Sequence, residues 1–349
     1  MIYESTILGY NIAKYILKEI KVKKNKHKRK YSRSYTINIG CFLKTQPISI
    51  AFLLNCVTMI VRSDVMKNYT VLIMDLKKSR SYLVEDRNSI QNYIIIVIKK
   101  LNEVFSSSLA RDVEFSAGDE IQGLFISPES AYLYFRMFCM LVSPVEIRAG
   151  IGIGEWNIKI ENASTTAQDG PVYHNARNAI QNIKDSLGYS VLIYSGTEAD
   201  LFLNALINTS FVLTGNHSEY QNELMLISEL LYPVDYRQVI DHSKINLISK
   251  LAASKNKLHY YTYYKKSKSV KRYPFDEIEF MNLEPIPIDA ANDDGNFYVS
   301  SGKKRGMTTQ LAEILNISRQ SIEKTFKTAN IYEARNLTIV ALKFMDKYL

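Results

Sequence analysis

Three acidic residues in the first half of the chain have the type and setting that phosphate chemistry requires. Asp75 follows the apolar, β-rich run 69–74, while Asp119 and Glu120 lie in a Gly-Asp turn between two short apolar runs. A Gly-Asp pair in that setting is typical of a hairpin. We therefore expect Asp75 and Asp119 to lie side by side, although they are 44 positions apart in the sequence. Two carboxylates this close raise each other's pKa unless a cation lies between them.

The chemical prediction is a divalent cation between Asp75 and Asp119. Carboxylate oxygens suit Mg²⁺ or Mn²⁺, which bind through one or two carboxylates together with substrate phosphates. Such a pair can hold two metals that activate a 3′-hydroxyl and neutralise a triphosphate. Glu120 is a further candidate ligand, although neighbouring strand residues face opposite sides. Spacing alone leaves an alternative equally open, in which Gly118-Asp119 is only a tight turn and Asp75 only caps a strand end.

The elements that must position these acids predict an α+β fold. The runs with the composition or alternation of strands are 69–74, 113–116, 121–126, 146–156 and 189–194. Helices are indicated by the apolar spacing over 85–105, by the N-cap and first-turn proline of Ser127-Pro128, and by Pro171. The order strand, helix, hairpin, helix, strand is that of a ferredoxin-like (split βαβ) palm domain, with an antiparallel sheet covered by helices on one face.

One expected strand carries glycines on a single face. Gly150, Gly152 and Gly154 alternate with apolar residues over 146–156, so the three share a side of the sheet. A glycine face lets either another backbone or a ligand approach closely. The pattern does not distinguish these two readings.

The charge of the chain is concentrated in its first part. Residues 1–65 hold 12 Lys/Arg and 3 Asp/Glu; subtracting these from the 44 and 35 of the whole chain leaves 32 of each. The first part is predicted to be a basic, disordered extension, or the product of a start codon assigned too early, with Met66 as the true first residue. Its apolar run 47–61 is short of the ~20 residues of a membrane span. The three cysteines are scattered along the chain, which favours a protein of the reducing cytoplasm.

The C-terminal residues predict a helix-turn-helix. Short helices are expected over 308–315 and 318–329, with Ala312 at the helix crossing and Asn316 in the turn. The side chains available for DNA on the second helix are Ser318, Arg319, Gln320 and Lys324. The basic residues 303–305 could meet phosphates. The alternative is a docking or oligomerisation pair, which uses the same core pattern.

Four separated motifs resemble the SatD family of bacterial proteins. They are Met74-Asp75, Gly-Asp-Glu-Ile-Gln-Gly-Leu at 118–124, the strand 148–155, and Asp-Gly-Pro-Val-Tyr-His-Asn-Ala-Arg at 169–177. With the terminal helices, the similarity covers about residue 67 to the end. The family has little assigned biochemistry, so the resemblance implies no reaction. The chain also has a second, weaker similarity to class III nucleotide cyclases and diguanylate cyclases.

The cyclase similarity implies roles for individual residues. Asp75 and Asp119 match the metal aspartates, and Gly118 matches the glycine beside which a nucleotide approaches. The further nucleotide-binding candidates are Asp169, Asn175 and Arg177, of which Arg177 is also the candidate catalytic phosphate contact. Class III cyclases carry Asn and Arg four positions apart on this helix, whereas Asn175 and Arg177 are two apart and cannot share a helical face. This departure argues against efficient cyclisation.

The sequence thus predicts four parts: an extension over 1–65, a palm-like α+β domain over 66–196, a helical or irregular connector over 197–302, and a helix-turn-helix over 303–349. The favoured function is a cytoplasmic regulatory protein that couples a metal- and nucleotide-binding palm-like domain to DNA. The alternatives are a Mg/Mn-dependent nucleotidyl cyclase or nucleotidyltransferase and a protein-interaction scaffold. No membrane contact is expected, and a homodimer is left open.

Overall fold

The structure is a computed structural model that describes residues 68–185, 188–255, 258–264, 284–292 and 297–349. The predictions for residues 1–65, including the apolar run 47–61, lie outside the described residues. Residues 68–349 form one compact unit. Within the described ranges, no helix has both the length and the apolar character that crossing a bilayer requires.

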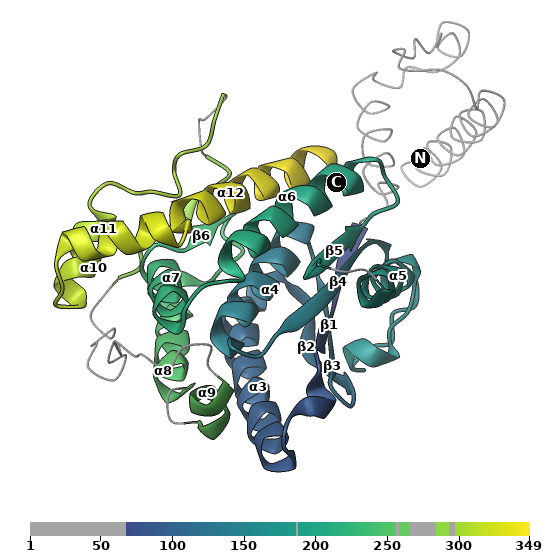
Figure 1. The fold of residues 1–349 in the computed structure, drawn as a ribbon. Helices are drawn as coiled ribbons and strands as arrows, with labels where there is room; N and C mark the ends of the chain where they lie inside the picture. The colour runs from purple at the N-terminus through teal and green to yellow at the C-terminus, as the bar shows by residue number, and fades with distance from the viewer. Residues whose placement is uncertain (1–67, 186–187, 256–257, 265–283, 293–296) are drawn as a thin grey trace, which may run out of the picture. The chain divides into compact units, whose positions relative to one another are not determined.

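A five-stranded mixed sheet forms the centre of this unit (Figure 1). Its strands are β1 (Asn68–Leu76), β2 (Leu109–Ala117), β3 (Glu120–Phe125), β4 (Ile147–Glu155) and β5 (Val191–Tyr194), in the order β2-β3-β1-β4-β5. β1 is antiparallel to both β3 and β4, β5 is parallel to β4, and the β2–β3 register is shifted at several points. The predicted α+β class is confirmed, but the sheet is mixed because β5 is parallel.

Helices cover both faces of the sheet, which corrects the one-face prediction. α3 (Val84–Val104) and α4 (Pro128–Val142) lie on one face, and α5 (Pro171–Asp185) lies on the other (Figure 1). Even-numbered residues of β1 such as Leu72 belong to the core with α3 and α4, while Val71 and Ile73 pack with α5. A strand buried on both faces needs a continuous apolar run, as β1 has.

The glycines of β4 explain how α5 reaches the sheet. A Cβ on Gly152 would lie 2.1 Å from the backbone N of Ala176, and one on Gly150 would lie 2.4 Å from that of Ile180. These glycines therefore make room for the backbone of α5, which settles the choice left open by the sequence pattern.

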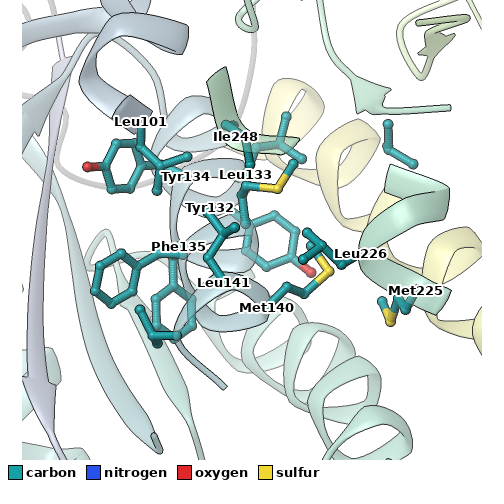
Figure 2. Close-up of a cluster of buried hydrophobic side chains, with 14 of the residues drawn as sticks. Leu101, Tyr132, Leu133, Tyr134, Phe135, Met140, Leu141, Met225, Leu226 and Ile248 are labelled. Carbon is teal, nitrogen blue, oxygen red and sulfur yellow. The ribbon is translucent and has the colours of Figure 1, made fainter. Parts of the chain in front are cut away.

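The hydrophobic core on the α3 and α4 face of the sheet continues into helices that follow the sheet in sequence. These are α6 (Ala199–Thr214), α7 (Glu219–Leu231), α8 (Ile245–Lys255) and α9 (His259–Tyr264). Figure 2 shows Met225 and Leu226 of α7 and Ile248 of α8 in one cluster with aromatic and aliphatic side chains of α4. Short 3₁₀ helices lie at Ser79–Ser81, Ser106–Ser108, Thr165–Ala167 and His242–Lys244.

Two asparagines of α6 occupy the free edge of β5. Asn204 Oδ1 accepts from Ile193 N (2.7 Å), and Asn204 Nδ2 donates to Ile193 O (2.8 Å). One helical turn later, Asn208 makes the same two bonds to Val191, at 3.4 and 2.7 Å. The amides thus take the hydrogen bonds that a sixth strand would take.

The C-terminal part consists of helices and a small second sheet. β6 (Val234–Asp235) pairs in parallel with β7 (Ile288–Asp289), and the helices are α10 (Met307–Ile314), α11 (Arg319–Thr328) and α12 (Ile331–Tyr348). The two short helices expected around Asn316 are confirmed, and Asn316 has a φ of 49° in the turn between them. The separate long helix α12 was not predicted.

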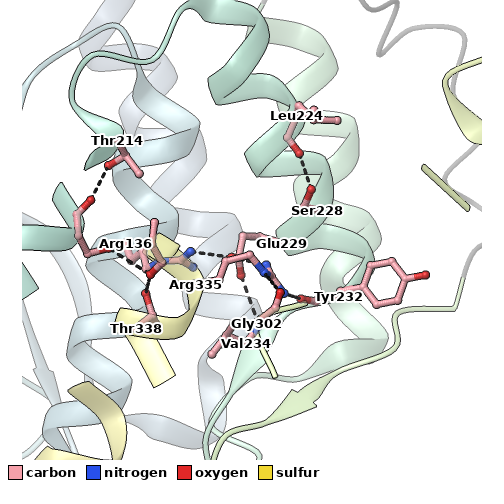
Figure 3. Close-up of polar contacts among 12 residues, drawn as sticks. Arg136, Thr214, Leu224, Ser228, Glu229, Tyr232, Val234, Gly302, Arg335 and Thr338 are labelled. Carbon is pink, nitrogen blue, oxygen red and sulfur yellow. Dashed lines mark hydrogen bonds and ion pairs between the residues drawn. The ribbon is translucent and has the colours of Figure 1, made fainter. Parts of the chain in front are cut away.

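A buried ion cluster attaches α12 to α4 and α7 (Figure 3). Arg335 of α12 donates to Glu229 of α7, and Arg136 Nη2 of α4 donates to the same carboxylate oxygen at 2.6 Å. Arg335 also donates to the carbonyl oxygens of Gly302 (2.9 Å) and Tyr232 (2.6 Å). Arg136, Glu229 and Arg335 are called the buried triad below.

Candidate functional site

Asp75 lies on the face of β1 that packs against α5 and is only 7% exposed. Arg148, its neighbour across the β1–β4 ladder, donates to Asp75 Oδ2 from both Nε (2.9 Å) and Nη2 (2.6 Å). Lys184 Nζ of α5 lies 3.6 Å from the same oxygen. Two protein cations therefore neutralise the Asp75 carboxylate.

Glu120 lies directly opposite Asp75 in the β1–β3 ladder, so both carboxylates are on the α5 face. Glu120 Oε2 accepts from Arg177 Nη1 of α5 (2.7 Å), and Oε1 accepts from Ser116 Oγ (2.8 Å). Arg177 Nη2 also lies 3.4 Å from Gln122 Oε1. The structure thus brings Arg177 and Glu120 to the same end of the sheet as Asp75.

Gly118 and Asp119 form the tight turn between β2 and β3. Gly118 has a φ of 62°, in the left-handed region that favours glycine. Asp119 is partly exposed, and its side chain has no hydrogen bond or ion pair to any other residue that the structure describes. The cross-strand neighbour of Asp75 is therefore Glu120, with Asp119 one residue further into the turn.

Asp169 and Asn175 hold the start of α5 in place. Asp169 Oδ1 accepts from Gly170 N (2.7 Å), and Asn175 Nδ2 donates to the carbonyl oxygen of Ile153 in β4 (2.7 Å). Ile153 lies five residues along β4 from Arg148, about 17 Å away. The structure separates these two nucleotide-binding candidates from the acids of the hairpin.

Arg148 and Lys184 were not identified as site residues from the sequence. Arg148 is two positions before Gly150 in β4, so its side chain lies on the same face of the sheet as Gly150 and Gly152, the face covered by α5. Lys184 follows Arg177 by seven positions, or two helical turns. Both signals can be recognised once α5 is known to cover that face. Asp75, Glu120, Arg148, Arg177 and Lys184 are called the charged cluster below.

The charged cluster can bind anions more readily than a bare metal ion. Among the described residues, no group of three or more His, Cys, Asp or Glu side chains is placed to hold a metal. A cation at Asp75 would have to displace Arg148, whereas Asp119 has no competing partner in the described structure. Guanidinium groups recognise phosphate oxygens, and the Arg177 side chain is 54% exposed.

The four residues expected to contact DNA lie at the start and on the surface of α11. They are Ser318, Arg319, Gln320 and Lys324, all exposed. Ser318 is the N-cap, and its Oγ accepts from the backbone N of Ser321 at 3.2 Å. Arg319 Nη2 lies 3.9 Å from Glu323 Oε1, a contact that is weak at an exposed position.

Comparisons with known proteins give a family but no reaction. Among solved structures, one titled as a bacterial light-regulated adenylyl cyclase is similar at a TM-score of 0.27 and 12% identity, over 36% of this chain and 74% of that chain. No curated protein matches. The model of the SatD family matches residues 69–277, more than half of the chain, and its span includes the whole charged cluster. The chain therefore belongs to the SatD family.

Proposed function

We propose that this chain is a regulatory protein whose ferredoxin-like palm domain binds a nucleotide at the charged cluster, and whose helices α10 and α11 bind DNA as a helix-turn-helix. The observation that carries the proposal is the pair of hydrogen bonds from Arg148 to Asp75. Two-metal catalysis would need this carboxylate for a metal, but a guanidinium occupies it. The arrangement supports recognition of a nucleotide more than its turnover.

The cations of the cluster suit the phosphates of a nucleotide. The Arg177 side chain is 54% exposed and the Glu120 side chain 16% exposed, so solvent screens the pair on the arginine side, and exposed pairs contribute only about 0–1 kcal/mol. Arg177 can therefore leave Glu120 for a phosphate at little expense in free energy. Lys184, whose side chain is 34% exposed, can approach the same group. A Mg²⁺ or Mn²⁺ that arrives with the phosphates would find Asp119 without a competing partner in the described structure.

We expect metal-dependent binding of ATP or GTP that Asp119→Asn weakens at least about tenfold, because the substitution removes the acid available to the cation. The melting temperature should change little, since Asp119 has no described partner to lose. Isothermal titration with Mg²⁺, Mn²⁺ or EDTA measures both the affinity and its metal dependence. Lys99→Gln, an exposed change on α3, is the matched control.

Two outcomes would contradict this part of the proposal. Equal nucleotide affinity in Asp119→Asn and the unmodified chain would show that the acidic turn takes no part in nucleotide binding. Formation of a cyclic nucleotide or pyrophosphate, detected by mass spectrometry, would favour a nucleotidyl cyclase or nucleotidyltransferase instead. That alternative is supported by the facing carboxylates of Asp75 and Glu120.

We expect Arg319→Ala and Lys324→Ala to weaken duplex DNA binding, by about 1–3 kcal/mol of sequence discrimination for a contact to a base edge. Lys303→Ala should weaken all sequences alike, because a phosphate contact carries no sequence information. Gel-shift titration in low salt tests this, with exposed Lys347→Ala on α12 as control. Absence of duplex binding, with or without nucleotide, would assign α10 and α11 to protein interaction.

A further inference from the structure

A cavity of about 280 Å³ lies between α4, α6 and α7, beside the start of β4. Its wall includes Cys139, Met140 and residues 143–147 around the end of α4, residues 210, 211, 214 and 215 at the end of α6, and residues 217–219 before and at the start of α7. Further polar side chains of the lining are Lys77, Arg136, Ser190 and Asn222. The cavity is separate from the charged cluster, none of whose members line it.

Three residues of the cavity wall also hold the C-terminal helices. Arg136 is joined through Glu229 to Arg335 of α12. Ser210 Oγ donates to the carbonyl oxygen of Ala334 in α12 at 3.2 Å. His217 Nε2 is hydrogen-bonded at 2.7 Å to the carbonyl oxygen of Ala329, between α11 and α12. A molecule in the cavity would therefore touch the groups that attach α12.

The most deeply buried charged side chain of the cavity wall, Arg136, is a cation. Arg136 is 5% exposed and lines the cavity, and within the described structure only its Nη2 donates a hydrogen bond, to Glu229. The buried triad, drawn in Figure 3, has two guanidinium groups and one carboxylate, so one of its positive charges is not compensated within the triad. An uncompensated buried charge destabilises the fold, and a bound counter-ion would reduce this destabilisation.

The remaining lining limits the ligand to a small amphipathic molecule. Met140, Phe211 and Met225 supply apolar surface. Burial raises the pKa of the Cys139 thiol, which therefore adds no negative charge. Two acids also line the cavity: Glu146 is exposed, and Glu219 is partly buried, as Lys77 is, so Arg136 is the most deeply buried charged side chain of the wall.

We propose that this cavity binds a small organic anion, with its acid group toward Arg136 and Lys77 and its apolar part against Met140 and Phe211. The bound anion neutralises the excess charge of the buried triad and thereby strengthens the attachment of α12. Such a ligand stabilises the native state according to its concentration relative to its Kd. The proposal rests on the cavity alone and holds whether or not the chain binds nucleotide or DNA.

The test uses benzoate as the probe, with benzylamine as a cation of similar shape. Benzoate should raise the melting temperature of the full chain and benzylamine should not. Thr214→Trp, which fills the cavity from α6, should weaken benzoate binding at least about tenfold by isothermal titration. Thr209→Trp, an exposed change on the same helix, should leave it unchanged. Lys77→Met should weaken it about fivefold without touching the triad.

Hydrogen exchange measured by mass spectrometry tests the link to α12. Benzoate should slow amide exchange over residues 329–338 in the unmodified chain and in Thr209→Trp, but not in Thr214→Trp. Equal binding of benzoate and benzylamine, unchanged benzoate affinity in Thr214→Trp, or no benzoate binding up to 20 mM (roughly a hundredfold weaker than a typical metabolite site) would overturn the anion site. Benzoate binding without slower exchange over 329–338 would overturn its coupling to α12.

Discussion

Replacing Glu229 by glutamine is expected to lower the free energy of unfolding by about 3–5 kcal/mol, the usual effect of removing one partner from a buried ion pair. The side chain of Glu229 is 1% exposed, and glutamine preserves its shape while removing its charge. Arg136 and Arg335 would then face each other without an anion between them. A loss of this size is a large fraction of the 5–15 kcal/mol that stabilises a typical domain. Urea unfolding at pH 7 measures it.

The triad also predicts an order among its variants. Arg136→Met should be the mildest, because it leaves the neutral pair Arg335–Glu229 and the bonds from Arg335 to the carbonyls of Gly302 and Tyr232. Arg335→Met should lie between Arg136→Met and Glu229→Gln, since those two carbonyls lose their donor. Finding Arg136→Met to be as damaging as Glu229→Gln would contradict the charge argument.

The pH dependence of the Glu229→Gln effect has a defined direction. Burial by itself raises the pKa of Glu229, but Arg136 and Arg335 outweigh it and hold the pKa below its usual value. A carboxylate with a lowered native pKa stabilises the fold above its unfolded pKa of about 4.3. This contribution is lost as the pH falls through the native pKa. The stability gap between the unmodified chain and Glu229→Gln should therefore persist from pH 7 to about pH 4 and narrow below it.

Replacing Lys255 by methionine is expected to raise the free energy of unfolding at pH 7 by about 3 kcal/mol. Lys255 is 1% exposed, and its Nζ has no hydrogen-bond partner among the described residues. Burial lowers its pKa from 10.5 to about 8, and Glu223 and Glu219 offset this only in part. Each pKa unit corresponds to about 1.4 kcal/mol. The loss of the contact between Nζ and the Tyr261 ring, at 4.8 Å, will reduce the gain somewhat.

The gain from Lys255→Met should fall as the pH rises. Below pH 8 the native state must bury a protonated amine, so methionine helps most. Between pH 8 and 10.5 the native amine is neutral while the unfolded chain still binds the proton, so the unmodified chain gains stability with pH. Chemical unfolding at pH 7, 9 and 10.5 follows this change, with exposed Lys250→Met on α8 as control. A destabilising Lys255→Met at pH 7, or a gain that does not vary with pH, would refute the argument.

The sequence predicted the elements whose signals are local. The apolar run of β1 is visible because both faces of that strand are covered, and Ser127-Pro128 marks the start of α4 because capping depends on adjacent residues. The parallel pairing of β5 is set by its position beside β4, which no local pattern records. The glycines of β4 predicted a close approach without identifying α5 as the segment that approaches.

The candidate site was predicted less well because its contacts join distant elements. The hairpin turn at Asp119 and the strand carrying Asp75 could be located, but the partner of Asp75 depends on the register of β1 against β4. The sequence also gave no reason to bury Glu229 and Arg335, which lie 106 positions apart. Charged residues of an amphipathic helix are ordinarily assigned to solvent.

Asn204 and Asn208 have a consequence for how this molecule can assemble. A free strand edge invites a strand from another chain, and proteins use charges, bulges or coverage to prevent this. At β5 the asparagine amides of α6 already bond the backbone groups that another strand would pair with. At the opposite edge the register shifts of β2 make its backbone irregular, so a second strand could not pair with it in regular register. Two copies of this chain should therefore associate through side chains and helix surfaces, and not by joining their sheets into one.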